Sequence, residues 1–320
     1  MSVVASSIVG MRILLVLVVA LTAVLCPSAE GEQLSKTLVI VDTGFDTTIP
    51  TIKDAVVFEV CILDWPMCPN GKNFQEGVGA ASISINPIAT GSIAHGTQMA
   101  SIAMEVNPTQ KLVLLRLIAY NNQGQRLPVY DSAVVQAFKW IQKKQTELNI
   151  GAVAMAQGHH SLLSGKNYCP KNTELEKIFL DLKLKNLPIF LPTGNAGDKS
   201  RIDWPACIPT ALAIGAIDSK GEIASYSNYD RILVDFYTPG TASATLPGGT
   251  RTTVTGTSVS TLIAASNWMK VTDMGLQNSV ADTAQLFRDA SPIIFDAKLR
   301  YGRKMDVEAT LLKLRDIPKP

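Results

Sequence analysis

Three short segments, far apart in the chain, carry an acid, a base and a nucleophile. Asp42 stands in Val-Asp-Thr-Gly, His95 in His-Gly-Thr and Ser258 in Gly-Thr-Ser. A serine hydroxyl attacks a carbonyl carbon when an imidazole takes its proton. The imidazole in turn needs a carboxylate that fixes its tautomer and stabilises it once it is protonated. These three side chains therefore predict hydrolysis by an activated serine.

A fourth segment, Pro192–Gly197, supplies an amide between small residues. It follows the apolar run Pro188–Leu191, so it is expected at the end of a buried strand. The negatively charged oxygen that forms when a serine attacks a carbonyl needs hydrogen-bond donors aimed at it. The side-chain amide of Asn195 is the donor that this segment predicts.

The elements that must position these residues follow the pattern of an α/β fold. Short β-branched and apolar runs alternate with longer helical stretches, which is typical of a mostly parallel central sheet with helices on both faces. The runs are apolar almost throughout, as strands buried on both faces should be. We predict strands at Thr37–Val41, Leu112–Leu117, Ala152–Ala156, Pro188–Leu191, Ala211–Ile217 and Leu233–Phe236, and helices at Ser132–Gln145, Thr173–Leu184 and Val259–Met269.

The reactive residues fall at the ends of these elements. Asp42 ends the strand Thr37–Val41, and binding groups gather at the carboxyl ends of strands in open α/β sheets. His95 precedes apolar residues at helical spacing, so it is expected at the start of a helix. Ser258 opens a glycine-preceded helix, where backbone N–H groups help to hold an oxyanion. The segment Cys61–Pro87 is rich in Asn, Gly and Pro and is interpreted as surface loops.

The motifs and their order resemble those of the subtilisin-like serine peptidases, the subtilases. The resemblance extends over nearly the whole chain after the N-terminal segment and implies a three-layer subtilisin-like fold. It implies that Asp42, His95 and Ser258 form a catalytic triad and that Asn195 donates to the oxyanion. Further segments similar to the family are Trp204–Cys207, Ala211–Ala216, Ala224–Asn228, Thr238–Gly240 and Tyr301–Ala309.

The same resemblance implies how a peptide substrate binds. The segment Gly151–Gly158 is expected to pair with an extended peptide through main-chain hydrogen bonds. The substrate-binding residues at its end are Met155, Ala156, Gln157 and Gly158.

If Trp204-Pro205 aligns with the family pattern, the resemblance also implies that Asp203 lies at the base of the primary specificity pocket. A carboxylate there favours Lys or Arg before the scissile bond. Lys199 and Arg201 lie close in the sequence, so the alternative role for Asp203 is a surface ion pair that contributes little.

Three departures from the family pattern leave the reactive atoms in place. Leu262 stands where the family usually has a proline, Gln98 where it often has a second histidine, and Ala156 where it often has a serine. A helix starts without that proline, and the substrate strand binds through its backbone. The prediction is a serine endopeptidase. The alternatives are a catalytically silent peptide-binding protein of the same fold, and an esterase.

No cofactor or metal is predicted. Thr51 stands where many subtilases place a calcium-binding aspartate, so the usual calcium site is expected to be absent, although calcium remains an option for the family. His159 and His160 are adjacent, and neighbours in a strand point to opposite faces. We interpret them as loop residues near the substrate groove, in preference to a metal site.

Residues 1–29 are predicted to be a secretory signal. Leu14–Leu25 is an apolar run too short to span a bilayer, and Met11 offers an alternative translation start. Lipid attachment at Cys26 is the alternative, which Leu25 disfavours. Export to a periplasm or to the outside of the cell follows, without a stable membrane anchor.

Residues 30–320 are predicted to form one peptidase domain. Of the 320 residues, 47% are hydrophobic, and a net charge of +2 gives no basic field for nucleic acid. Residues 30–41 leave no room for the inhibitory propeptide that the family places before its domain. The chain therefore folds unaided, relies on a separate inhibitor or folding partner, or is a binding module that needs no restraint.

Four cysteines remain after the signal, in a chain directed to an oxidising compartment. They allow three pairings, and we favour Cys61 with Cys68 and Cys169 with Cys207 because this choice costs least in loop geometry. A metal site is the alternative, but no Cys-x-x-Cys spacing or nearby histidine favours it.

Overall fold

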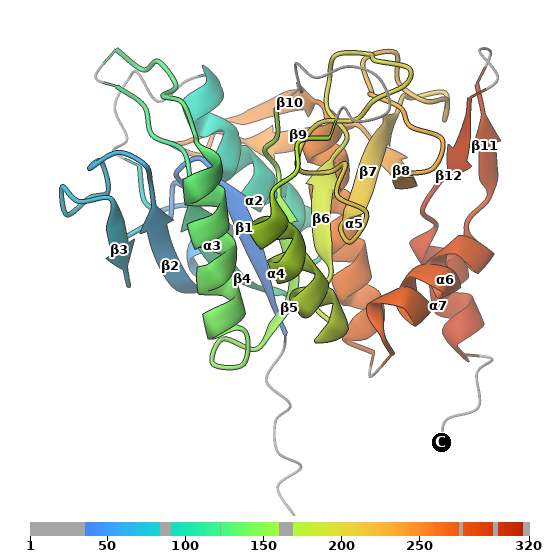
Figure 1. Cartoon of the computed structure of the whole chain (residues 1–320), viewed down its shortest axis with the longest axis horizontal. Coiled ribbons are helices and arrows are strands. Elements are labelled where there is room, and N and C mark those ends of the chain that lie inside the picture. The colour runs from blue at the N-terminus through green and yellow to red at the C-terminus, as the bar shows by residue number, and fades with distance from the viewer. Residues whose placement is uncertain are drawn as a thin grey trace, which may run out of the picture. The chain divides into compact units, whose positions relative to one another are not determined.

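An eight-stranded sheet, parallel except at one edge, lies at the centre of the computed structural model (Figure 1). The structure describes residues 36–83, 91–121, 123–159, 169–274, 278–296 and 300–315. The strand order is β3-β2-β4-β1-β5-β6-β7-β8. The strands are β1 Thr37–Asp42, β2 Val56–Ile62, β3 Phe74–Glu76, β4 Lys111–Arg116, β5 Ile150–Met155, β6 Ile189–Pro192, β7 Leu212–Ile217 and β8 Val234–Pro239.

Helices connect the strands, and two short hairpins lie outside the main sheet. The hairpins are β9 Thr241–Thr245 with β10 Arg251–Thr255, and β11 Ile293–Phe295 with β12 Tyr301–Arg303. The helices are α1 Pro50–Lys53, α2 His95–Val106, α3 Asp131–Lys144, α4 Thr173–Leu184, α5 Thr257–Thr272, α6 Val280–Ala290 and α7 Val307–Arg315, with a 3₁₀ turn at Gly91–Ala94.

Both faces of the sheet are covered because its strands are apolar on both sides. In β1, Leu38 and Ile40 belong to the core shared with α2 and α5, whereas Val39 and Val41 belong to the core shared with α3 and α4. Successive side chains of a strand point to opposite faces, so one apolar run serves two cores. The predicted three-layer α/β fold is confirmed, and each predicted strand is found with its bounds shifted by three residues or fewer.

The interpretation of Cys61–Pro87 as surface loops was wrong for part of that segment. β2 continues through Cys61 to Ile62, and β3 pairs with it as the antiparallel edge of the sheet. Glu59 interrupts the apolar pattern of β2 but is only 5% exposed. Its carboxylate accepts the backbone N–H groups of Gly79 at 2.9 Å and Ala81 at 3.1 Å. A buried charge satisfied in this way fits within a strand.

Two disulfides are present, in the pairing that the sequence favours. Cys61 is joined to Cys68, and Cys169 to Cys207. The second bond links the segment before α4 to the loop that follows β6. None of the helices in the described part of the chain is long and apolar enough to cross a membrane. The predicted signal, residues 1–29, lies outside the described residues.

Candidate active site

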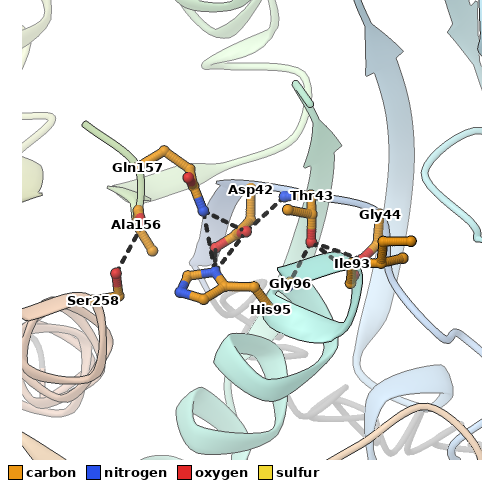
Figure 2. Close-up of polar contacts among 9 residues, drawn as sticks. All are labelled: Asp42, Thr43, Gly44, Ile93, His95, Gly96, Ala156, Gln157 and Ser258. Carbon is orange, nitrogen blue, oxygen red and sulfur yellow. Dashed lines mark hydrogen bonds and ion pairs between the residues drawn. The ribbon is translucent and has the colours of Figure 1, made fainter. Parts of the chain in front are cut away.

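Three elements end or begin where Asp42, His95 and Ser258 meet. Asp42 is the last residue of β1, which lies between β4 and β5 in the middle of the sheet. His95 is the first residue of α2, and Ser258 is the second residue of α5. Both helices pack on the same face of the sheet. The three side chains therefore lie together at the carboxyl edge of the strands (Figure 2).

Asp42 and His95 form a direct contact. Nδ1 of His95 lies 2.8 Å from Oδ1 and 2.9 Å from Oδ2 of Asp42. Asp42 is fully buried, and the His95 side chain is 26% exposed. Burial lowers the pKa of His95, but the charge of Asp42 and its hydrogen bond together raise it by more. The pKa therefore lies above the ordinary 6.5, although Arg126 opposes the rise.

The first two motifs contact each other directly. Oγ1 of Thr43 accepts the backbone N–H of Gly96 at 2.7 Å and donates to the carbonyl of Ile93 at 3.1 Å. A side chain at Gly96 would begin only 2.7 Å from the carbonyl oxygen of Gly44. The threonine and the glycine beside the reactive residues thus fix the start of α2 against the end of β1. Sequence reasoning assigned no role to Thr43.

The hydroxyl of Ser258 donates to the backbone carbonyl of Ala156 at 3.0 Å. Within the described residues there is no hydrogen bond between Ser258 and His95. Both side chains line a cavity of about 240 Å³, together with Asn195 and Asp203. A rotation of the Ser258 side chain is needed to direct the hydroxyl at the imidazole. Such contacts often tighten only when substrate is bound.

Asn195 is held by the residue that precedes Ser258. Its Oδ1 accepts the backbone N–H of Thr257 at 2.9 Å and the hydroxyl of Thr257 at 3.0 Å. The same hydroxyl accepts the N–H of Gly194 at 3.2 Å. Because both donors converge on the oxygen of the amide, the orientation of Asn195 is fixed and its Nδ2 is left to donate elsewhere.

Asp203 lies against the loop that carries Asn195. Its Oδ1 accepts from Nδ2 of Asn228 at 2.9 Å, and Oδ1 of Asn228 accepts the N–H of Ala196 at 3.0 Å. A side chain at Gly194, whose φ is +101°, would begin 2.3 Å from the Asp203 carboxyl carbon. Arg201, the neighbour considered as a partner for Asp203, pairs with Asp198.

The predicted substrate strand continues the sheet beyond β5. The N–H of Ala156 donates to the carbonyl of Val41 at 3.2 Å. Gln157 and Gly158 line both the 240 Å³ cavity and a neighbouring cavity of about 680 Å³, which Met155 also lines. The Gln157 side chain turns toward the acid, with its Nε2 at 2.9 Å from Oδ1 of Asp42. Sequence reasoning missed this contact.

His159 lies in a loop beside the larger cavity, as predicted. Its ring centroid is 5.0 Å from that of Trp204, and the backbones of the two residues exchange hydrogen bonds of 2.9 and 3.0 Å. His160 lies outside the described residues.

The described residues around Thr51 provide two carboxylates and two basic groups. Thr51 lines a cavity of about 370 Å³ with Asp54, Glu105, Lys111 and Arg251. Glu105 forms an ion pair with Arg251, and Nζ of Lys111 donates to the Asp54 carbonyl at 3.1 Å. Calcium requires several oxygen ligands that carry net negative charge, whereas basic groups already balance the carboxylates. No metal-binding cluster of His, Cys, Asp or Glu occurs among the residues described.

Comparisons with known proteins show the family to which the chain belongs. The family model described as the subtilase family matches residues 36–290, so the chain belongs to the subtilase family. A cuticle-degrading serine protease of Arthrobotrys oligospora is 29% identical over 150 residues, which cover 46% of this chain and 32% of that protein. Subtilisin amylosacchariticus of Bacillus subtilis subsp. amylosacchariticus is 23% identical over 235 residues, covering 69% of this chain and 51% of that protein.

The fold is similar to that of a cold-adapted subtilisin-like serine proteinase of known structure. The TM-score is 0.63 at 17% identity, over 85% of this chain and 88% of that one. The matched region spans about a third of the first sequence relative and about half of the second.

Proposed function

We propose that the protein is a serine endopeptidase that uses Asp42, His95 and Ser258 as acid, base and nucleophile. The observation that carries the proposal is the pair of short contacts between Asp42 and His95, where His95 lines one cavity together with Ser258 and Asn195. An acid that orients a base beside a serine hydroxyl is the arrangement that serine hydrolysis requires. Membership of the subtilase family favours the same activity.

In the proposed reaction, Nε2 of His95 takes the proton of Ser258 as Oγ bonds to the peptide carbonyl carbon. The carbonyl oxygen becomes an oxyanion, which Nδ2 of Asn195 and the backbone N–H of Ser258 stabilise. The C–N bond then breaks, and His95 gives its proton to the departing amine. Water attacks the resulting ester by the same route and restores Ser258. Because His95 must be neutral to act, activity falls as pH drops through its raised pKa.

The first test is labelling of the folded, oxidised protein with a fluorophosphonate probe, followed by mass spectrometry of the adduct. We expect the adduct on Ser258 and on no other serine. A folded sample without an adduct would favour the silent peptide-binding alternative. Labelling combined with turnover of small esters but not of peptides would favour the esterase.

Asn195→Ala is expected to lower kcat by about 10²- to 10³-fold, with little change in KM, because one donor to the oxyanion is lost. Thr257→Val is the comparison. It removes the hydroxyl that donates to Asn195 Oδ1 but keeps the backbone N–H of Thr257, so a smaller loss of kcat is expected. Steady-state kinetics on one peptide substrate measure both. An Asn195→Ala enzyme with wild-type kcat would remove this residue from the mechanism.

Asp203 is proposed to select a basic residue before the scissile bond. Asp203→Asn keeps an oxygen for Asn228 and removes the charge, with an NH₂ group in place of the second carboxylate oxygen. We expect the ratio of kcat/KM for Lys or Arg over neutral residues to fall by about tenfold or more. Profiling with a peptide library measures the ratio. A preference unchanged from that of the wild type would contradict the role, whatever the overall activity.

We propose that the fold does not depend on calcium at the Thr51 position. A cation that binds only the folded state raises the unfolding temperature as its concentration increases. We therefore expect the same unfolding temperature in EDTA and in millimolar calcium. A rise with calcium would show a calcium site in the folded chain and would contradict the proposal.

Two further proposals concern the setting of the enzyme. We propose that residues 1–29 direct export, to a periplasm or to the outside of the cell, and that a separate protein assists folding or restrains activity. Fractionation of cells expressing the full chain would test the first proposal. Refolding of the purified chain without additions would argue against a required folding partner.

A further inference from the structure

We propose that Gln157 is a positioning residue for the acid and base: its side-chain amide holds the Asp42 carboxylate and shares that carboxylate with His95. The inference deepens the proposed function, on which it rests. Gln157 comes from the substrate strand, and its side chain is turned away from solvent with 9% exposed. Figure 2 shows its amide nitrogen directed at both Asp42 and His95.

The donors around Asp42 are distributed unevenly between its two oxygens. Oδ1 accepts the backbone N–H of Thr43 at 2.6 Å and Nε2 of Gln157 at 2.9 Å, and it lies 2.8 Å from Nδ1 of His95. Oδ2 faces Nδ1 of His95 at 2.9 Å. The amide and the backbone therefore hold Oδ1, while both carboxylate oxygens face Nδ1 of the imidazole.

The chemistry requires the nitrogen of the amide at this position. The amide oxygen of Gln157 would face the carboxylate of Asp42 and repel it, so the network assigns Nε2 as the atom in contact. Nε2 is also 3.1 Å from Nδ1 of His95. With the proton on Nδ1, both groups are donors, and Asp42 is the acceptor that they share.

This sharing opposes a positive charge on the imidazole. The N–H dipole of Gln157 has its positive end beside Nδ1 of His95, which disfavours a positive charge on the ring. The same N–H group donates to Asp42 and so weakens the attraction between the Asp42 carboxylate and the imidazolium. Besides Asp42, Arg126 acts on His95, and it disfavours the charged ring. Asp203 is the other charged residue that lines the same cavity. Gln157 and Arg126 thus act in the same direction, against Asp42.

Gln157 also belongs to the segment that holds the nucleophile. The carbonyl of its neighbour Ala156 accepts the hydroxyl of Ser258, while the Gln157 side chain contacts Asp42. Two consecutive residues of the substrate strand therefore contact Ser258 and Asp42, the proposed nucleophile and acid. No motif in the sequence marks this role, because the contact joins residues 115 positions apart.

The test is an NMR titration of the His95 ring in the full chain, for the wild type and for Gln157→Met. Loss of the amide donor is expected to raise the pKa of His95 by about half to one unit. Gln157→Glu adds a carboxylate beside the pair and is expected to raise it further. The pH at which kcat/KM falls on the acid side should rise together with the pKa of the ring. An unchanged titration in both variants would overturn the proposal.

Gln110→Met is the matched control. Gln110 is also a buried glutamine, and its Nε2 donates to the carbonyl of Ala103 at 2.7 Å and to Ser266 at 3.1 Å, away from the cavity. Loss of the Gln110 amide is expected to lower the unfolding temperature and to leave the pKa of His95 unchanged. An equal shift in Gln110→Met and Gln157→Met would mean general loosening and would overturn the proposal. The titration needs no turnover, so it decides the role of Gln157 even if the protein hydrolyses no peptide.

Discussion

Ser258→Ala is expected to lower kcat by about 10⁶-fold, the scale of loss when the nucleophile of a triad is removed. The substitution deletes only Oγ, whose hydrogen bond runs to the carbonyl of Ala156. The N-terminus of α5 and the Asp42–His95 contact do not depend on that atom. The measurement is kcat on a peptide substrate, with circular dichroism to show that the variant is folded.

Ser260→Ala is the matched control for this prediction. Ser260 lies two residues further along α5 and is fully buried, and its hydroxyl donates to the carbonyls of Thr238 and Pro239, each at 3.2 Å. Its loss is expected to cost about 1 kcal/mol of stability and to leave kcat near the wild-type value. Peptide hydrolysis that persists in Ser258→Ala at the wild-type rate would exclude Ser258 as the nucleophile.

The central strands could be predicted because burial on both faces leaves a local signal. The strands β1, β4 and β7 are nearly continuous apolar runs, and each was found where the sequence placed it. β2 was not predicted because Glu59 interrupts its apolar pattern. That carboxylate accepts from two backbone N–H groups and a serine hydroxyl some 20 residues further along the chain. The strands of the hairpins outside the sheet are short, and few of their residues are buried.

The places of Asp42, His95 and Ser258 in the fold could be predicted for a different reason. Each stands at the end of an element and within a motif of small residues, so type and local context suffice to select it. The supporting contacts have no such signal. Thr43 fixes the start of α2, and Thr257 fixes the Asn195 amide. Asn228 fixes the Asp203 carboxylate. Each of these hydrogen bonds joins two different segments of the chain. Only the assembled fold brings these partners together, and the same holds for Gln157.

Asp42→Asn is expected to lower kcat by about 10⁴-fold while the fold persists. The N–H of Thr43 and Nε2 of Gln157 both donate to Oδ1, so an asparagine keeps its oxygen at that position. Its Nδ2 must then take the place of Oδ2, which lies 2.9 Å from Nδ1 of His95. A donor that faces Nδ1 forces the ring proton onto Nε2. In that tautomer His95 has no free lone pair on Nε2 with which to accept the proton of Ser258.

Asp46→Asn is the control. It shows whether the loss of kcat in Asp42→Asn comes from the His95 tautomer or from the loss of any buried carboxylate. Asp46 is 1% exposed and accepts from the backbone N–H of Thr48 at 2.9 Å and of Gly248 at 2.8 Å, without contact to His95. It is expected to lose stability and to keep kcat. ¹⁵N NMR of the His95 ring should show the proton on Nδ1 in the wild type and in Asp46→Asn, and on Nε2 in Asp42→Asn. A proton that stays on Nδ1 in Asp42→Asn would mean that Thr43 and Gln157 do not fix the orientation of residue 42, and the tautomer argument would fail even if activity were lost.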